Sequence, residues 1–268
     1  EATVRANSAL YKEKYGDNPH PRVHPEIRNV EACIKSSSMA IELAQQHGAR
    51  LHILHITTGE ETHLFRNDIP LKDKKITSEV CVHHLWFDAR DYETLGNQIK
   101  CNPAVKADGH KQQLLAALLD DRIDVIATDH APHTWEEKQN PYWSSPSGLP
   151  LVQHALPALF ELVEEGVLTV AQLVRKTSHA VADLFAISER GYLREGYWAD
   201  MTLIERLPAP RAVSLDPVLA HCQWTPFVHH RFHHRVATTL VSGQLAWHEG
   251  RLVDGCQGLP LAFNARRG

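Results

Sequence analysis

Residues 126–134 read IATDHAPHT, an apolar strand that runs directly into Asp129 and His130. In a parallel α/β barrel the catalytic side chains follow the carboxyl ends of the strands, because the loops there build the active site. An Asp in this place can bind a metal ion and accept a proton from water. The alternative is an Asp that only caps the next turn. We favour the functional role. A catalytic Asp directly after an apolar strand is typical of an α/β fold with a parallel sheet.

Strands and helices alternate along residues 1–187. Apolar segments predict strands at 51–56, 76–82 and 123–128, and helical periodicity predicts helices at 29–47, 59–66, 109–119, 150–166 and 170–186. This alternation indicates parallel βαβ units, as in a TIM (β/α)8 barrel. The first 28 residues are rich in Pro, Gly and charge, and we predict that they form a loop.

Residues 188–268 have a different character. The segments GYLREGYWADMTLIE (191–205) and RVATTLVSGQLAWHEGRLVD (235–254) contain short strands separated by Gly turns. They predict a small β module that ends in a C-terminal tail. We therefore expect two parts, with the boundary between residues 187 and 188.

The composition excludes several classes of function. The 268 residues carry a net charge of −4, so we expect no electrostatic attraction to nucleic acid or to a membrane surface. No apolar run approaches the roughly 20 residues that a membrane span needs. The five cysteines show no CxxC spacing, which favours reduced thiols and a cytoplasmic location. The 19 histidines favour a metal site, because imidazole is the commonest metal ligand.

Polar side chains stand at the ends of three successive predicted strands. The first strand ends at His55, the second at His83 and His84, and the third at Asp129, with His133 on the loop that follows. In a parallel barrel these ends converge on one mouth. His55 and Asp129 suit a metal pair that activates water, with Asp129 acting first as base and then as acid. His133 either donates a hydrogen bond to an anionic substrate or is a plain loop histidine.

Two further segments could contact a ligand. In CNPAVK (101–106), the proline disfavours a helical conformation for Asn102, whose amide offers both a donor and an acceptor to a cyclic imide or amide. The alternative is a simple turn residue. In SPSGLPL (145–151), Gly148 allows a close approach of backbone to ligand, and a plain turn fits equally well.

These motifs together resemble the dihydroorotase family of the cyclic amidohydrolase superfamily, which are metal-dependent TIM barrels. The resemblance covers nearly the whole chain in the right order, and DHAPH followed by EEK is its most specific piece. The matching segments are LHILHIT, EVCVHHL, KCNPAVK, IATDHAPHTWEEK, SGLPLVQHALPALFELV, GYLREGYWADMTLIE and LVSGQLAWHEGRLVD.

The resemblance implies roles for individual residues. His55 would be the strand-six ligand of the second of two zinc ions, and Asp129 the strand-eight ligand of the first and the general base. Asn102 and His133 would hold the substrate, and the backbone around Ser147 and Gly148 would contact the pyrimidine ring. The remaining motif residues would support them: His83 and His84 as a surrounding shell, and Glu79 as a group that orients these histidines or a ligand.

The implied activity is the reversible cyclisation of N-carbamoyl-L-aspartate to L-dihydroorotate in pyrimidine biosynthesis. The resemblance also implies a cytoplasmic homodimer, with aspartate carbamoyltransferase as a candidate partner. The alternatives are an enzyme similar to allantoinase or dihydropyrimidinase, and a non-catalytic scaffold.

The chain departs from the family pattern in one respect. The family's HxH, its strand-four Lys or Asp and its strand-five His all precede the segments that match. The chain thus resembles about the C-terminal 60% of the enzyme, and its three recognisable strands cannot close an eight-stranded barrel. A piece of a longer protein is our preferred explanation, ahead of a split enzyme or a truncated homologue. By itself the chain is expected to bind zinc poorly and to be inactive.

Overall fold

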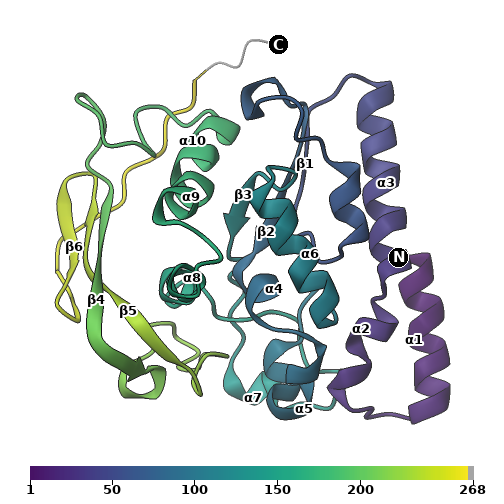
Figure 1. The fold of residues 1–268 in the computed structure, drawn as a ribbon. Helices are drawn as coiled ribbons and strands as arrows, with labels where there is room; N and C mark the ends of the chain where they lie inside the picture. The colour runs from purple at the N-terminus through teal and green to yellow at the C-terminus, as the bar shows by residue number, and fades with distance from the viewer. Residues whose placement is uncertain (265–268) are drawn as a thin grey trace. The chain divides into compact units, whose positions relative to one another are not determined.

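The computed structural model describes residues 1–264, which divide into two compact units (Figure 1). The first unit comprises Glu1–Ala155 and Asp216–His229. The second comprises Leu156–Leu215 and the chain from His230 onward. This division rests on contacts between residues, whereas the boundary expected between residues 187 and 188 rests on sequence character and stays a prediction.

A parallel three-stranded sheet lies at the centre of the first unit, in the order β1-β2-β3. The strands are β1 (Leu51–Ile53), β2 (Ile76–Cys81) and β3 (Val125–Ala127). Buried side chains such as Val80 and Val125 make the sheet apolar, as expected for parallel strands covered on both faces. The parallel α/β arrangement predicted from the sequence is confirmed.

Two long helices flank this sheet, and both were predicted. Helix α3 (Val30–Gln46) begins where the Asn29 side chain accepts a hydrogen bond from the backbone N–H of Ala32, and it packs against β1. Helix α6 (Asp108–Leu119) buries Leu114 and Leu118 and packs against α4 (Val82–Trp86). The loop between β1 and β2 contains the 3-10 turns η2 (Glu60–Leu64) and η3 (Leu71–Asp73).

Two sequence predictions are wrong in the first unit. The segment predicted as a loop contains helix α1 (Ala2–Tyr15), the turn η1 (Pro21–Val23) and helix α2 (His24–Ile27). The Gly and Pro signals begin only at residue 16, so they did not describe α1. The second strand ends at Cys81, so His83 and His84 lie in helix α4 instead of at a strand end.

Several short helical segments were not predicted. They are η4 (Ala89–Asp91), α5 (Tyr92–Leu95), η5 (Gly96–Ile99) and α7 (Trp135–Lys138). At four or fewer residues each, they are too short to show a hydrophobic period. None of the described helices is long and apolar enough to cross a membrane.

The second unit contains helices and an antiparallel sheet in the order β4-β5-β6-β7. Between β5 and β6, two residues with positive φ, Ser242 (51°) and Gly243 (80°), form the type of tight turn that suits a twisted hairpin. The predicted β module is therefore present. The strands and helices of the second unit are α8 (Ala155–Glu164), α9 (Val170–Val174), a π-helical turn (Arg175–His179), α10 (Ala180–Phe185), β4 (Met201–Ala212), η7 (Val213–Leu215), β5 (Arg231–Val241), β6 (Gln244–His248) and β7 (Arg251–Leu252).

Candidate active site

His55 and Asp129 occupy equivalent places in the first unit. Each lies two residues beyond the end of its strand, His55 after β1 and Asp129 after β3. Both have a left-handed backbone, with φ of 43° and 48° respectively. Asp and His adopt this conformation more readily than most residues, and strained backbone clusters at functional sites. The shared distortion supports the prediction that these two side chains belong to one site.

Glu79 on β2 interacts with both His55 and Asp129. Its carboxylate accepts a long hydrogen bond of 3.4 Å from the backbone N–H of His55 and lies 3.1 Å from Nε2 of His52. Burial and the negative charge of Glu79 raise the pKa of Asp129, while His55 acts in the opposite direction. Asp129 is therefore a stronger base than a fully solvated Asp, although its side chain remains exposed. Among the described residues Glu79 contacts His52 and His55 on the β1 side and forms no hydrogen bond with the histidines of α4.

Asn102 lies on a loop whose neighbouring carbonyls accept hydrogen bonds from buried side chains. It is exposed and is followed by a cis peptide bond to Pro103, while its neighbour Cys101 is buried. The buried ring of His24 bonds to the Cys101 carbonyl at 2.7 Å, and Lys106 donates to the Ala104 carbonyl at 2.8 Å. Within the described chain the Asn102 amide makes no hydrogen bond. Its donor and acceptor are both available to a ligand, as its predicted role requires.

His133, Ser147 and Gly148 are brought together by contact between two loops. Nε2 of His133 lies 3.2 Å from the Ser147 carbonyl oxygen. A Cβ atom on Gly148 would lie 2.5 Å from the carbonyl oxygen of Ala131, and the φ of Gly148 is 145°. The glycine is therefore required by the close approach of another backbone segment. Whether these three residues also bind substrate stays a prediction.

Lys138, which was not predicted as a site residue, connects these loops by hydrogen bonds. Its side chain is 1% exposed, and Nζ donates to the carbonyls of Lys100 at 3.2 Å, Pro146 at 3.0 Å and Gly148 at 3.0 Å. Burial lowers its pKa to about 7. Lys138 thus ties the loop that carries Asn102 to the loop that carries Ser147 and Gly148.

A local signal for Lys138 was present in the sequence. Thr134 and Glu137 form a capping box: Thr134 Oγ1 accepts from the Glu137 N–H at 3.2 Å, and the Glu137 carboxylate accepts from the Thr134 N–H at 2.8 Å. This box starts the short helix α7 and places Lys138 on its inner side. His130 has a similar structural role, because its Nδ1 accepts from the backbone N–H groups of Leu151 and Val152 at 2.9 and 3.1 Å.

The described residues supply only part of a zinc site. His55 and Asp129 offer an imidazole nitrogen and a carboxylate oxygen, which are common zinc ligands, but zinc centres take at least three protein donors. Within the described residues, the group of three or more metal-type donors found within 4.8 Å of one another is His83, His84 and Cys101. The donor types therefore fit the predicted zinc site, and their number does not complete it.

No family model matches the chain. It is 34% identical to the dihydroorotase of Halobacterium salinarum over 231 residues, which is 86% of this chain and 53% of that protein. It is 32% identical to the dihydroorotase of Bacillus cytotoxicus over 238 residues, covering 88% and 53% of the two chains. Over most of its length the chain is therefore similar to dihydroorotases. It spans about half the length of these curated relatives.

The fold comparison agrees with this similarity. The structure of dihydropyrimidinase from Brevibacillus agri matches with a TM-score of 0.82 at 22% identity, over 94% of this chain and 56% of that one. At this identity the match shows the fold alone, which is that of an amidohydrolase TIM barrel in part.

Proposed function

We propose that this chain provides part of a dihydroorotase active site, which interconverts N-carbamoyl-L-aspartate and L-dihydroorotate. The observation that carries the proposal is the pairing of His55 and Asp129, which share a left-handed backbone just beyond two strands of one parallel sheet and interact electrostatically. Identity to named dihydroorotases over most of the chain supports it.

Asp129 would move the proton in this reaction. As a carboxylate with a raised pKa, it can accept a proton from the attacking water and then donate it to the ring nitrogen that leaves. Glu79 would sustain this raised pKa through its charge. When bound, two zinc ions would lower the pKa of water and polarise the ring carbonyl. His55 and Asp129 are the donors that this chain would contribute to them.

The substrate contacts would come from the two loops whose carbonyls accept hydrogen bonds from Lys138. The free amide of Asn102 suits the cyclic imide, and the backbone at Ser147 and Gly148 would lie along the ring. His133 already uses Nε2 on the Ser147 carbonyl, so a substrate carboxylate would meet it at Nδ1. That atom lies 3.6 Å from the Glu137 carboxylate, which the substrate would have to replace.

A dihydropyrimidinase-like activity is the second candidate, because the fold matches such an enzyme. Its substrate lacks the carboxylate of dihydroorotate, so the two activities can be separated. Protein from its native source should be assayed on dihydroorotate, dihydrouracil, hydantoin and allantoin. We expect turnover of dihydroorotate and an increase in its KM in His133→Ala. Preference for dihydrouracil would favour the second candidate, and no turnover by folded, metal-loaded protein would favour a scaffold.

The remaining expectations follow from the family. We propose a homodimer in the cytoplasm, with aspartate carbamoyltransferase as a candidate partner, and the five free thiols support a reducing compartment. The chain alone is expected to hold zinc weakly at His55 and Asp129. Zinc bound tightly by the chain and released by the His55→Ala substitution would contradict this expectation.

A further inference from the structure

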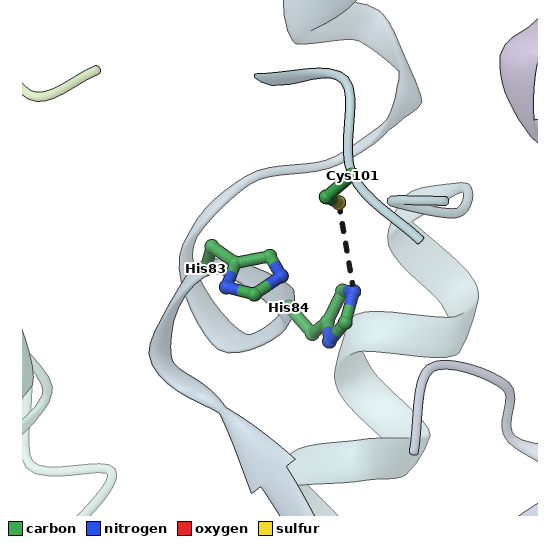
Figure 2. A group of neighbouring side chains, drawn as sticks. All are labelled: His83, His84 and Cys101. Carbon is green, nitrogen blue, oxygen red and sulfur yellow. Dashed lines mark hydrogen bonds between the residues drawn. The ribbon is translucent and has the colours of Figure 1, made fainter. Parts of the chain in front are cut away.

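His83, His84 and Cys101 form a buried cluster beneath the Asn102 loop (Figure 2). Helix α4 supplies the two histidines, and the segment before the cis proline supplies the cysteine. The three residues are 1%, 2% and 1% exposed, and their potential ligand atoms lie within 4.8 Å of one another. In Figure 2 the two rings lie side by side and the thiol approaches Nε2 of His84, at 4.0 Å.

Three of the four imidazole nitrogens of this cluster have no hydrogen-bond partner among the described residues. Neither ring nitrogen of His83, nor Nδ1 of His84, makes a hydrogen bond to any described residue. The backbone of Thr128 opposes the pKa shift of His83 but forms no hydrogen bond of normal geometry with the ring. Nearly all buried polar groups in native proteins form hydrogen bonds, and a bound ion is one of the recognised explanations for an exception.

The protonation states suit a metal. Burial lowers the pKa of His83 to about 3 and that of His84 well below its usual value, so both rings are neutral and keep a lone pair. Burial raises the pKa of the Cys101 thiol to about 12, so the thiol is protonated when no cation is present. A cation that binds the sulfur displaces this proton to solvent, and a metal–sulfur bond replaces the S–H bond.

We propose that His83, His84 and Cys101 bind one soft or borderline transition-metal ion of the zinc or copper(I) class. One thiolate and two imidazoles are the donors that such ions prefer over the oxygen ligands of magnesium and calcium. With zinc–ligand bonds of about 2.3 Å to sulfur and about 2.0 Å to nitrogen, the two donors would be about 3.6 Å apart. The observed 4.0 Å between Cys101 Sγ and His84 Nε2 therefore needs a shift of only a few tenths of an ångström.

The binding has one identifiable cost. The Pro103 carbonyl lies 3.1 Å from the Cys101 thiol and 3.2 Å from His84 Nε2. A metal bound at both atoms would replace these two hydrogen bonds. Because Pro103 directly follows Asn102, occupancy would change the contacts of the loop proposed to hold the substrate. The metal site itself does not depend on that proposed function.

Cobalt(II) titration tests the site through an absorption band that oxygen and nitrogen ligands do not produce. A thiolate–cobalt bond gives a charge-transfer absorption band in the near ultraviolet, and neither His55 nor Asp129 can produce it. We expect one cobalt per chain with this band, its loss in Cys101→Ser, and its retention in His55→Ala. Cys81→Ser is the matched control, because Cys81 is also buried but stands outside the cluster.

The outcomes are decisive in either direction. Absence of the band in the wild-type chain, its retention in Cys101→Ser, or its equal loss in Cys81→Ser would overturn the proposal. If Cys101→Ser fails to fold by circular dichroism, His83→Asn provides the test. We expect that variant to keep the band and to bind cobalt at least tenfold more weakly, and unchanged affinity would overturn the assignment.

Discussion

Replacing Lys138 with methionine should loosen the two loops that carry the proposed substrate contacts. The Lys138 side chain donates hydrogen bonds to three carbonyls. One of them, the Lys100 carbonyl, also accepts a hydrogen bond from the Gly148 N–H at 2.9 Å. The carbonyls of Pro146 and Gly148 would thus lose the hydrogen bonds that they receive from Lys138. An unsatisfied buried group costs about 1–3 kcal/mol, so the loss at two carbonyls in Lys138→Met should lower the free energy of unfolding by about 2–6 kcal/mol at pH 9.

The effect should also depend on pH, with a sign that the structure fixes. Burial lowers the pKa of Lys138 in the folded chain to about 7, from its ordinary value of 10.5. Between these values the unfolded chain binds more protons, so the wild-type protein gains stability as the pH rises, by up to about 1.4 kcal/mol per pH unit. A neutral amine still has two N–H donors for the two dependent carbonyls. Lys138→Met lacks this gain, so its deficit should grow from pH 7 to pH 9.

Urea denaturation followed by circular dichroism at both pH values measures these differences. Lys72→Met is the control, because Lys72 is an exposed lysine, and it should stay within about 0.5 kcal/mol of wild type. The reasoning would be refuted if Lys138→Met matched wild type at pH 9. It would equally be refuted if the difference between the two proteins were the same at pH 7 and pH 9.

Three other predictions follow from single contacts. Lys74→Met breaks the buried pair in which Nζ lies 2.7 Å from the Asp124 carboxylate, and it should cost about 3–5 kcal/mol in urea denaturation; a loss below 1 kcal/mol would contradict this. Gly148→Ala should cost about 1–3 kcal/mol, because its Cβ would meet the Ala131 carbonyl, whereas alanine at Gly109 in α6, where no atom lies within 4 Å, should be neutral or stabilising. Glu79→Gln should lower the pKa of Asp129 in an NMR titration of the metal-free chain, and an unchanged or higher pKa would show that their charges do not interact.

The parallel sheet could be predicted from the sequence, because each strand of the sheet is an apolar segment next to a helical one. It was insufficient for α1, whose residues bury no side chain and so lack a strong amphipathic pattern. It also misplaced His83 and His84, since a buried strand and a buried short helix have the same apolar pattern over a few residues.

Part of the candidate site could be predicted from sequence motifs. His55, Asp129 and Asn102 could be named from their positions after strands or before proline. The left-handed backbone of His55 and Asp129 could not, because tertiary contacts impose it. Lys138 lies in TWEEK, which has the composition of an exposed helical turn, and its burial depends on carbonyls from two loops, one of them 38 residues away.

Turnover of dihydroorotate by wild-type and Asp129→Asn protein, each prepared from the native source with its metals, tests the central claim most directly. General acid–base catalysis contributes about 10²–10⁴-fold, so kcat should fall by that factor in Asp129→Asn. The fold should be unchanged, because Asp129 is exposed. Full activity in Asp129→Asn, or no dihydroorotate turnover by the wild-type protein, would contradict the account.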